Sequence, residues 1–312
     1  MYQFAPIVLF VYKRPEHTLR TLTSLASNVH AKNSVLYVFA DGPRADAEEA
    51  ELVSITQTMR VVKSAKWCRD VIIVQRGENL GLSKNIVDGV SRIVNMHGRA
   101  IVLEDDMVCS PFFLNYMNDA LIKYQNDENV ACISGYNYPV KKMPDSFFLL
   151  GADCWGWATW ERAWHLFEED GTVLLHQLQK ANLEIEFDFG GAYPYTQMLK
   201  NQIAGRNDSW AVRWYASCFL QNKYCLYPGK SFIENIGEDG SGIHCGAKKK
   251  TKRQLNNGFV LEKNSVTENL VAKRKIAQYL RSQANESSFE HLSRRWISAI
   301  GGLYRKIRNV PT

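Results

Sequence analysis

The first hundred residues alternate between short apolar runs and stretches whose apolar residues recur at helical spacing. The apolar runs are the length of strands buried on both faces, and they cover residues 6–12, 34–40, 70–75 and 100–104. The segments with helical spacing are 15–25, 45–62 and 83–96. Strands separated by helices of this length predict a parallel sheet with right-handed crossovers. The expected fold class is therefore α/β, with a mostly parallel central sheet flanked by helices.

A polar turn follows each of these four strands. The turns contain Lys13-Arg14, residues 41–44, residues 76–79 and residues 104–106, and their charges are complementary. In open parallel sheets, ligands bind beyond the carboxyl ends of the strands. A single polar turn at a strand end is most simply explained by exposure to solvent, but four such turns along one rim predict a small-molecule site.

The second half of the chain is less regular. Residues 135–244 are dense in tryptophan, and residues 261–281 and 290–308 have the pattern of helices. A stretch rich in lysine and asparagine, 246–258, separates these helices from the rest and marks the best boundary. We expect one main domain, 1–245, with halves 1–134 and 135–245, and a basic helical C-terminal appendage, 246–312.

The charge of the chain is unevenly distributed. The 312 residues are 46% hydrophobic and 22% charged, as in ordinary soluble proteins, and the formal net charge is +6. Residues 246–312 hold 15 Lys and Arg against 4 Glu, whereas the rest holds 23 basic and 28 acidic residues. Because a nucleic-acid enzyme would place its basic surface on the folded body, nucleic acid is not an expected partner. The basic tail fits either an amphipathic helix on an anionic membrane or a helix packed on the body.

The cysteines and the N-terminus favour a cytoplasmic protein, with or without peripheral contact on the inner face of the membrane. The seven cysteines are scattered and include no CxxC pair, so we expect neither a disulfide framework nor a structural zinc site. The N-terminus shows no signal-peptide pattern, and no apolar run approaches the ~20 residues that span a bilayer.

Three consecutive acids, Glu104, Asp105 and Asp106, follow the fourth apolar run directly. Since adjacent carboxylates repel one another, a compensating cation is expected here. Carboxylate oxygens suit Mg²⁺ or Mn²⁺, ions that also bind phosphate oxygens. A solvated acidic turn is the alternative.

This motif resembles that of the GT-A nucleotide-sugar glycosyltransferases, in which a strand ends in acids that hold a metal against the donor diphosphate. The pattern is most similar to the N-acetylglucosaminyltransferase I family and to family-2-like bacterial glycosyltransferases, since residues 104–107 read Glu-Asp-Asp-Met and residues 110–113 read Ser-Pro-Phe-Phe. The resemblance implies that Asp106 binds the metal, Asp105 contacts the donor sugar and Glu104 orients the nucleotide side.

The resemblance extends to the earlier strand ends and helices. Residues 10–25 are similar to the first strand and nucleotide-proximal helix of the family, which places Arg14 near the base and phosphates. Asp41 resembles the acid that hydrogen-bonds the uracil or ribose. Residues 79–90 resemble the helix before the acidic motif, with Lys84 or Asn85 facing the donor. A UDP-sugar donor and a glycan or lipid-linked saccharide acceptor are implied.

Candidates for the general base and a mobile lid lie in the second half. In the family, an Asp just before a Trp is the catalytic base of an inverting transfer, which implies this role for Asp208; a helix cap is the alternative. Residues 235–246 are similar to the glycine-rich donor loop of the family, and there His244 would contact the diphosphate or the metal.

Tryptophans in the second half predict either a sugar platform or core packing. The three candidates for the platform are Trp155, Trp157 and Trp210. Two other functions remain open: a nucleotidyltransferase and a catalytically inactive sugar-binding module. The first lacks its usual glycine-rich phosphate loop after the first strand, and the second would not need the acidic triplet.

Overall fold

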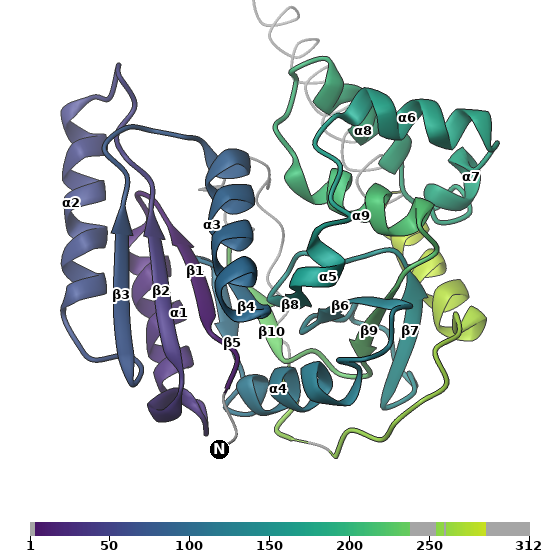
Figure 1. Cartoon of the computed structure of the whole chain (residues 1–312), viewed down its shortest axis with the longest axis horizontal. Coiled ribbons are helices and arrows are strands. Elements are labelled where there is room, and N and C mark those ends of the chain that lie inside the picture. Colours follow the sequence, from purple (N-terminus) through teal and green to yellow (C-terminus); the bar gives the residue numbers. More distant parts are fainter. Residues whose placement is uncertain (1–3, 238–253, 259, 285–312) are drawn as a thin grey trace, which may run out of the picture.

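The computed structural model describes residues 4–237, 254–258 and 260–284 (Figure 1). The expected helix 290–308, most of the expected glycine-rich loop and His244 lie outside the described residues.

The four strands expected in the first half are present and parallel. They are β1 (Ile7–Val11), β2 (Val35–Ala40), β3 (Asp70–Gln75) and β4 (Arg99–Glu104). They lie side by side in the order β3-β2-β1-β4, and every neighbouring pair is parallel. All five residues of β1 are buried, as its continuous apolar run predicts.

Four further strands extend the sheet beyond β4. They are β6 (Val130–Ser134), β7 (Ser146–Leu150), β8 (Trp157–Trp160) and β9 (Tyr224–Pro228), and the order continues β4-β8-β6-β9-β7. Only β8 and β7 run against the other six strands. The expected α/β class with a mostly parallel central sheet is confirmed. A separate antiparallel pair is formed by β5 (Met107–Cys109) and β10 (Ile233–Asn235).

Helices cover both faces of the sheet. The helix α1 (Pro15–Ala26) packs with α2 (Glu49–Lys63), and α3 (Leu82–His97) packs on β1 and β4 from the opposite face (Figure 1). One apolar side of α3 enters the core, where Ile86, Val90 and Ile93 are fully buried. The helix α2 begins four residues later than expected, because residues 41–48 form a turn at the strand-end rim.

The second half adds smaller helices. These are α4 (Phe113–Lys123), α5 (Glu161–Trp164), α6 (Gly171–Lys180), α7 (Glu184–Phe187), α8 (Tyr195–Ile203) and α9 (Trp210–Leu220). The helices α6 to α9 enclose a second hydrophobic cluster that includes Leu178, Phe187 and Leu199. This cluster holds the start of α9, and therefore Asp208, above the sheet.

The expected helix at 261–281 is wrong in its start, since the chain is helical only from residue 270 to 284. Before that, the segment follows the edge strand β7, where the amide of Asn269 donates to the carbonyl of Phe148 at 2.9 Å. The side chain of Asn269 then accepts from the amide of Ala272 at 2.9 Å and caps the new helix. Ala272 and Ile276 are fully buried in the main core. The described part of the predicted tail therefore belongs to the folded body.

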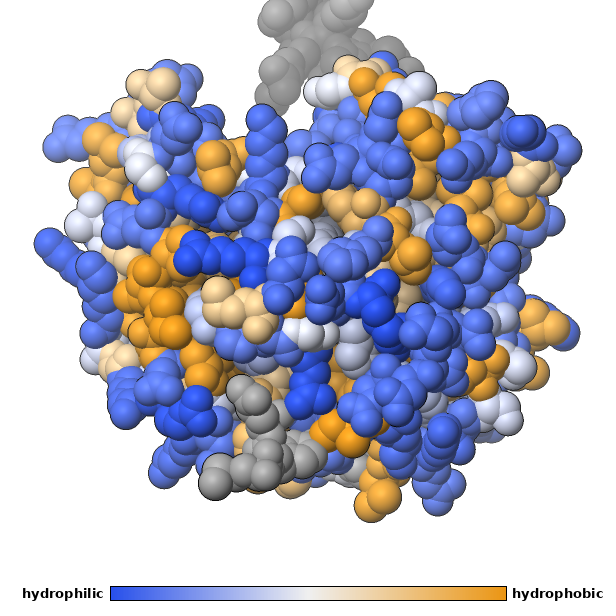
Figure 2. Space-filling view, in the orientation of Figure 1, coloured by the Kyte–Doolittle hydropathy of each residue, from blue (hydrophilic) through white to orange (hydrophobic). Residues whose placement is uncertain are grey.

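Within the described residues, no helix combines the length and the apolar character needed to cross a bilayer. The face shown in Figure 2 is mostly hydrophilic, with hydrophobic side chains in separate groups.

We expect Ile276→Ala to lower the free energy of unfolding by about 2–5 kcal/mol, because it empties a fully buried position. Val271→Ala, at an exposed position of the same helix, is the control and should change stability by less than about 0.5 kcal/mol. Urea denaturation of the two variants measures both values. Equal, small effects would contradict the packing of this helix into the core.

Candidate active site at the strand ends

The acids after β4 are buried beside an arginine. Asp105 and Asp106 are only 7% and 9% exposed. The Nη1 atom of Arg14, which follows β1, lies 3.2 Å from Asp105 Oδ1 and 3.0 Å from Asp106 Oδ2. The hydroxyl of Thr21 in α1 also donates to the carbonyl of Asp105 at 2.8 Å. Arg14 therefore provides compensating positive charge for the acidic triplet.

Burial and mutual repulsion make Glu104 and Asp105 hard to ionise. Burial, then the charge of Asp106, raises the pKa of Asp105 to about 7, although Arg14 lowers it. Burial raises the pKa of Glu104 well above its usual value, and the charges of Asp106 and Asp105 add to this effect. Such a site favours the arrival of further positive charge.

One carboxylate oxygen is suited to a metal ion. Asp106 Oδ1 is buried and has no hydrogen-bond partner among the described residues. No cluster of three or more His, Cys, Asp or Glu side chains that could enclose a metal occurs in the described parts of the chain. A divalent ion at Asp106 would therefore need ligands from a bound substrate or from residues outside the described ranges.

The chain approaches Asp106 again at the end of β10. The amide of Ile236 donates to the carbonyl of Asp106 at 2.9 Å. A Cβ atom on Gly237 would lie 2.1 Å from Asp106 Oδ2 and 2.8 Å from Arg14 Nη2, so only glycine fits this position without a shift. The start of the expected glycine-rich loop is thus in contact with the acidic triplet.

Glu51 connects the polar turns after β1 and β2, and sequence reasoning missed it. Its carboxylate accepts hydrogen bonds from the Tyr12 hydroxyl at 2.6 Å, from Lys13 Nζ at 2.6 Å and from Arg44 Nη2 at 2.6 Å. Hydrogen bonds from Arg44, then from Lys13 and Tyr12, lower its pKa to about 2. The position of Glu51 in the first turn of α2 was the available signal, since such acids often face a strand-end rim.

Asp41, for which the sequence predicts contact with a ribose or base, stabilises the neighbouring turn through hydrogen bonds. Its Oδ1 accepts from the amides of Gly42 at 3.0 Å and Leu80 at 2.9 Å. Its Oδ2 accepts from the amide of Gly81 and from Asn79 Nδ2, both at 3.1 Å. Because a carboxylate has about four acceptor positions, none is left for a ligand. Asp41 instead holds the turn that starts α3.

The two candidates in α3 differ. Lys84 is exposed in the first turn, where it can reach a ligand. Asn85 is only 3% exposed, and its Oδ1 accepts from Arg76 Nε at 3.2 Å. Of the two candidates, Lys84 is therefore the side chain that is accessible to a ligand, whereas Asn85 is buried against Arg76.

Asp208 is exposed and precedes α9. The side chain of Ser209 caps this helix by accepting from the amide of Val212 at 3.3 Å, so the alternative role of Asp208 as the cap is wrong. Arg213 Nη2 donates to Ser83 Oγ at 2.5 Å and joins the start of α9 to the start of α3. This contact, also missed from the sequence, brings the start of α9, which follows Asp208, next to the start of α3.

The predicted tryptophan platform is wrong for Trp157 and Trp210. They are 1% and 4% exposed and stack on each other with ring centroids 5.4 Å apart. All four residues of β8 are buried, so side chains on both faces of this strand are covered by the rest of the protein. Only Trp155 is partly exposed, with its ring against the edge of Tyr136 at 4.7 Å.

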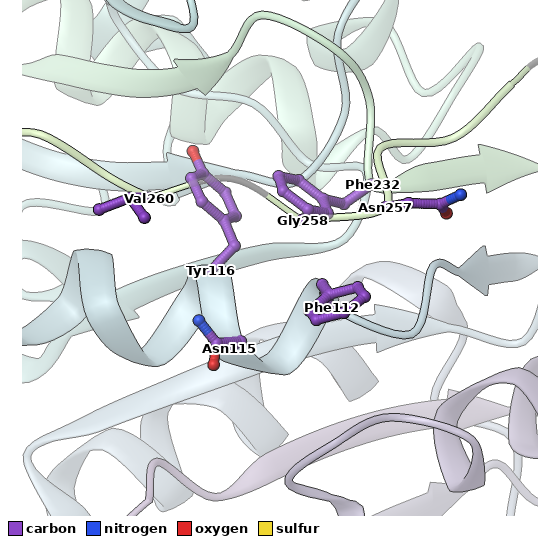
Figure 3. Close-up of a pocket in the computed structure, with 7 residues that line it drawn as sticks. All are labelled: Phe112, Asn115, Tyr116, Phe232, Asn257, Gly258 and Val260. Atoms are coloured by element: carbon purple, nitrogen blue, oxygen red, sulfur yellow. The ribbon is translucent and has the colours of Figure 1, made fainter.

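A cavity of about 370 Å³ is lined by none of the predicted site residues (Figure 3). It is lined by Asn257, Gly258 and Val260 and by side chains on and next to α4, with Phe112, Tyr116 and Phe232 among its lining residues. None of its lining residues is a predicted site residue or a titratable acid or base other than Tyr116. It is therefore not the candidate active site.

No known family model matches the sequence, and no curated protein matches it either. Among solved structures, the mannosyltransferase PcManGT from Pyrobaculum calidifontis, in complex with GDP-Man and Mn²⁺, is 11% identical over 45% of this chain and 37% of its own, with a TM-score of 0.32. Residues 1–349 of S. aureus TarS are 11% identical over 76% of this chain and 61% of their own, with a TM-score of 0.43. A second S. aureus TarS structure is 12% identical, covers 46% and 24%, and has a TM-score of 0.31.

This chain thus spans less than two thirds of each of these proteins. Each of these three TM-scores lies below 0.5, so these similarities do not establish the function of this chain.

Glu51→Gln should lower the free energy of unfolding at pH 7, because the ionised carboxylate holds three donors. The lowered pKa of Glu51 means that its contribution is complete above about pH 4.5 and is lost as pH falls toward 2. Urea denaturation between pH 7 and pH 2.5 should therefore show the difference between wild type and variant shrinking. Glu49→Gln, exposed in the same turn, is the control. A difference that is constant across this range would contradict the ion-pair role.

Proposed function

We propose that this protein is a glycosyltransferase of the GT-A type that moves a sugar from a UDP-sugar to a glycan or lipid-linked saccharide, with inversion at the anomeric carbon. The observation that carries this proposal is the buried acid pair at the end of β4, with an unpartnered oxygen on Asp106 and Arg14 beside it. The uridine nucleotide and the family relationship rest on the sequence resemblance. A hexose or an N-acetylhexosamine is the expected sugar.

The donor diphosphate would lie on the β1 side of the acids. Arg14 supplies positive charge there, and Lys13 and Arg44 keep 37% and 52% of their side chains exposed while Glu51 orients them. The start of α3, with Lys84 in its first turn, adds amide groups that favour phosphate. Asp105 and Glu104 would orient the sugar and the nucleotide.

Asp106 would hold Mn²⁺ or Mg²⁺, and its unpartnered oxygen fits a hard cation. When bound, such an ion neutralises the charge that develops on a departing diphosphate. His244 lies outside the described residues and is kept as a candidate for contact with the same groups.

Asp208 would act as the general base. Its carboxylate would accept the proton of the acceptor hydroxyl while the hydroxyl oxygen forms a bond to the anomeric carbon and the bond to the diphosphate breaks. A single displacement of this kind turns an α-linked donor into a β-linked product. Support comes from Ser209, because its capping bond leaves Asp208 unneeded as the helix cap.

The protein would act in the cytoplasm, and residues beyond 284 would supply any contact with an anionic membrane. The two alternative functions, a nucleotidyltransferase and an inactive sugar-binding module, differ from a glycosyltransferase in what they release from a nucleotide sugar. Release of UDP, GDP or TDP from nucleotide sugars in the presence of Mn²⁺ separates all three functions, because only a glycosyltransferase releases the nucleoside diphosphate and glycosylates an acceptor.

EDTA should abolish sugar transfer and Mn²⁺ should restore it. Asp106→Asn should bind the metal-dependent donor weakly while it unfolds at a temperature close to that of the wild type. Asp119→Asn, an exposed position on α4, is the matched control and should keep full activity. Full transfer in EDTA would remove the metal from the proposal.

Asp208→Asn should reduce turnover by about 10²–10⁴-fold and leave donor affinity unchanged, because the amide cannot accept the proton. Ser209→Ala removes the cap of α9 and should instead cost about 1 kcal/mol of stability with little loss of turnover. Steady-state kinetics and thermal melts of both variants test the assignment. Near-normal turnover of Asp208→Asn, or a product with the donor's anomeric configuration, would exclude Asp208 as the base.

A further inference from the structure

Strand β4 divides the rim of the sheet into two chemically different sides. On the β1 side lie charged groups, including Arg14, Lys13 and Arg44. On the other side, Val102 of β4 pairs with Trp157 of the antiparallel strand β8. The residues just before Trp157 therefore run along the carboxyl end of β4, and Cys154 lies within electrostatic range of Glu104 and Asp106.

Asp153 is held rigidly at this position. Its Oδ1 accepts from the amides of Cys154 at 2.6 Å and Trp155 at 3.1 Å. Tyr227 also lies close to this carboxylate, and burial raises the pKa of Asp153. A carboxylate fixed in this way keeps one orientation and can accept a further hydrogen bond.

Half-buried aromatic side chains surround Asp153. Tyr138 and Tyr195 lie close enough to each other and to Asp153 for their side chains to interact electrostatically. The ring of Tyr193 lies 4.5 Å from that of Tyr195, and the ring of Tyr279 lies 6.1 Å from that of Tyr138. Together with Trp155, all of these rings are partly exposed.

The helix 270–284 fixes the two loops that carry these tyrosines. Arg281 Nη2 donates to the carbonyl of Gly190 at 2.7 Å, in the loop before α8. Lys275 Nζ donates to the carbonyl of Lys142 at 2.6 Å, in the loop after Tyr138. The helix therefore holds both loops beside the aromatic cluster through these two hydrogen bonds, and such a preformed surface is typical of ligand-binding sites.

We propose that Asp153, Trp155, Tyr138, Tyr195 and Tyr279 form the subsite for one pyranose ring of an uncharged acceptor saccharide. The proposal rests on the proposed glycosyltransferase function and assigns its acceptor side. Aromatic faces pack against the C–H surface of a sugar, while the tyrosine hydroxyls and the carboxylate bond its hydroxyls. Because the cations lie on the β1 side, we expect the diphosphate to bind on that side and the neutral sugar ring to bind among the aromatic residues on the β8 side.

The test uses the full chain without nucleotide. Saturation-transfer NMR would measure binding of four probes: the methyl glycosides of glucose, galactose, mannose and N-acetylglucosamine. The wild type should bind at least one of them. Tyr195→Phe should weaken that binding by about five- to tenfold through loss of one hydroxyl, and Trp155→Leu should weaken it at least as much.

Tyr37→Phe is the matched control, because it removes a tyrosine hydroxyl that bonds His97 on the other half of the sheet. It should bind the probes as the wild type does, and thermal melts should show all three variants folded. Wild-type protein that binds none of the four probes, or unchanged binding in Tyr195→Phe and Trp155→Leu, would overturn the subsite.

Calorimetric titration with UDP and Mn²⁺ separates this inference from the proposed function. If the proposed function fails, the wild type binds and hydrolyses no nucleotide sugar, whatever its affinity for the saccharides. If only the subsite is wrong, nucleotide binding and sugar transfer persist, and the two variants transfer to saccharide acceptors with wild-type KM.

Discussion

The ion pair of Arg14 with Asp105 and Asp106 is the interaction on which the strand-end rim depends. It joins the end of β1 to the end of β4 and compensates acids that are less than 10% exposed. Buried carboxylates without a partner would be strongly destabilising, so the pair fixes how closely these two strand ends approach. Gly237 packs against both members of the pair, which brings the chain after β10 to the same point.

Other charged side chains around this pair bond to one another, and some of the cations among them stay exposed to solvent. Glu51 orients Lys13 and Arg44 without burying them, and Asp41 uses its carboxylate to shape the turn before α3. On the other side of β4, tyrosine and tryptophan rings replace the charges. The two sides of β4 therefore differ in chemistry at the strand end where Asp106 lies.

Periodicity predicts the strands and helices up to Glu104, and the parallel topology then brings their polar turns to one edge. The partners of individual side chains could not be predicted in this way. Asp41 bonds amides about forty residues further along the chain, so its saturation depends on how two turns pack. Trp157 lies in a strand whose four residues are all buried, and such a pattern does not distinguish a sugar platform from a core strand.

The number of basic residues in the C-terminal segment also did not predict which partners their side chains have. Basic residues of the helix 270–284 appear from the sequence to be available for an anionic surface, but three of them make internal contacts. Lys273 pairs with Glu268 at 2.9 Å, and Lys275 and Arg281 bond backbone carbonyls of two loops. Those loops carry the tyrosines beside Asp153. The positive charge of this segment therefore contributes to the shape of the aromatic side of the rim.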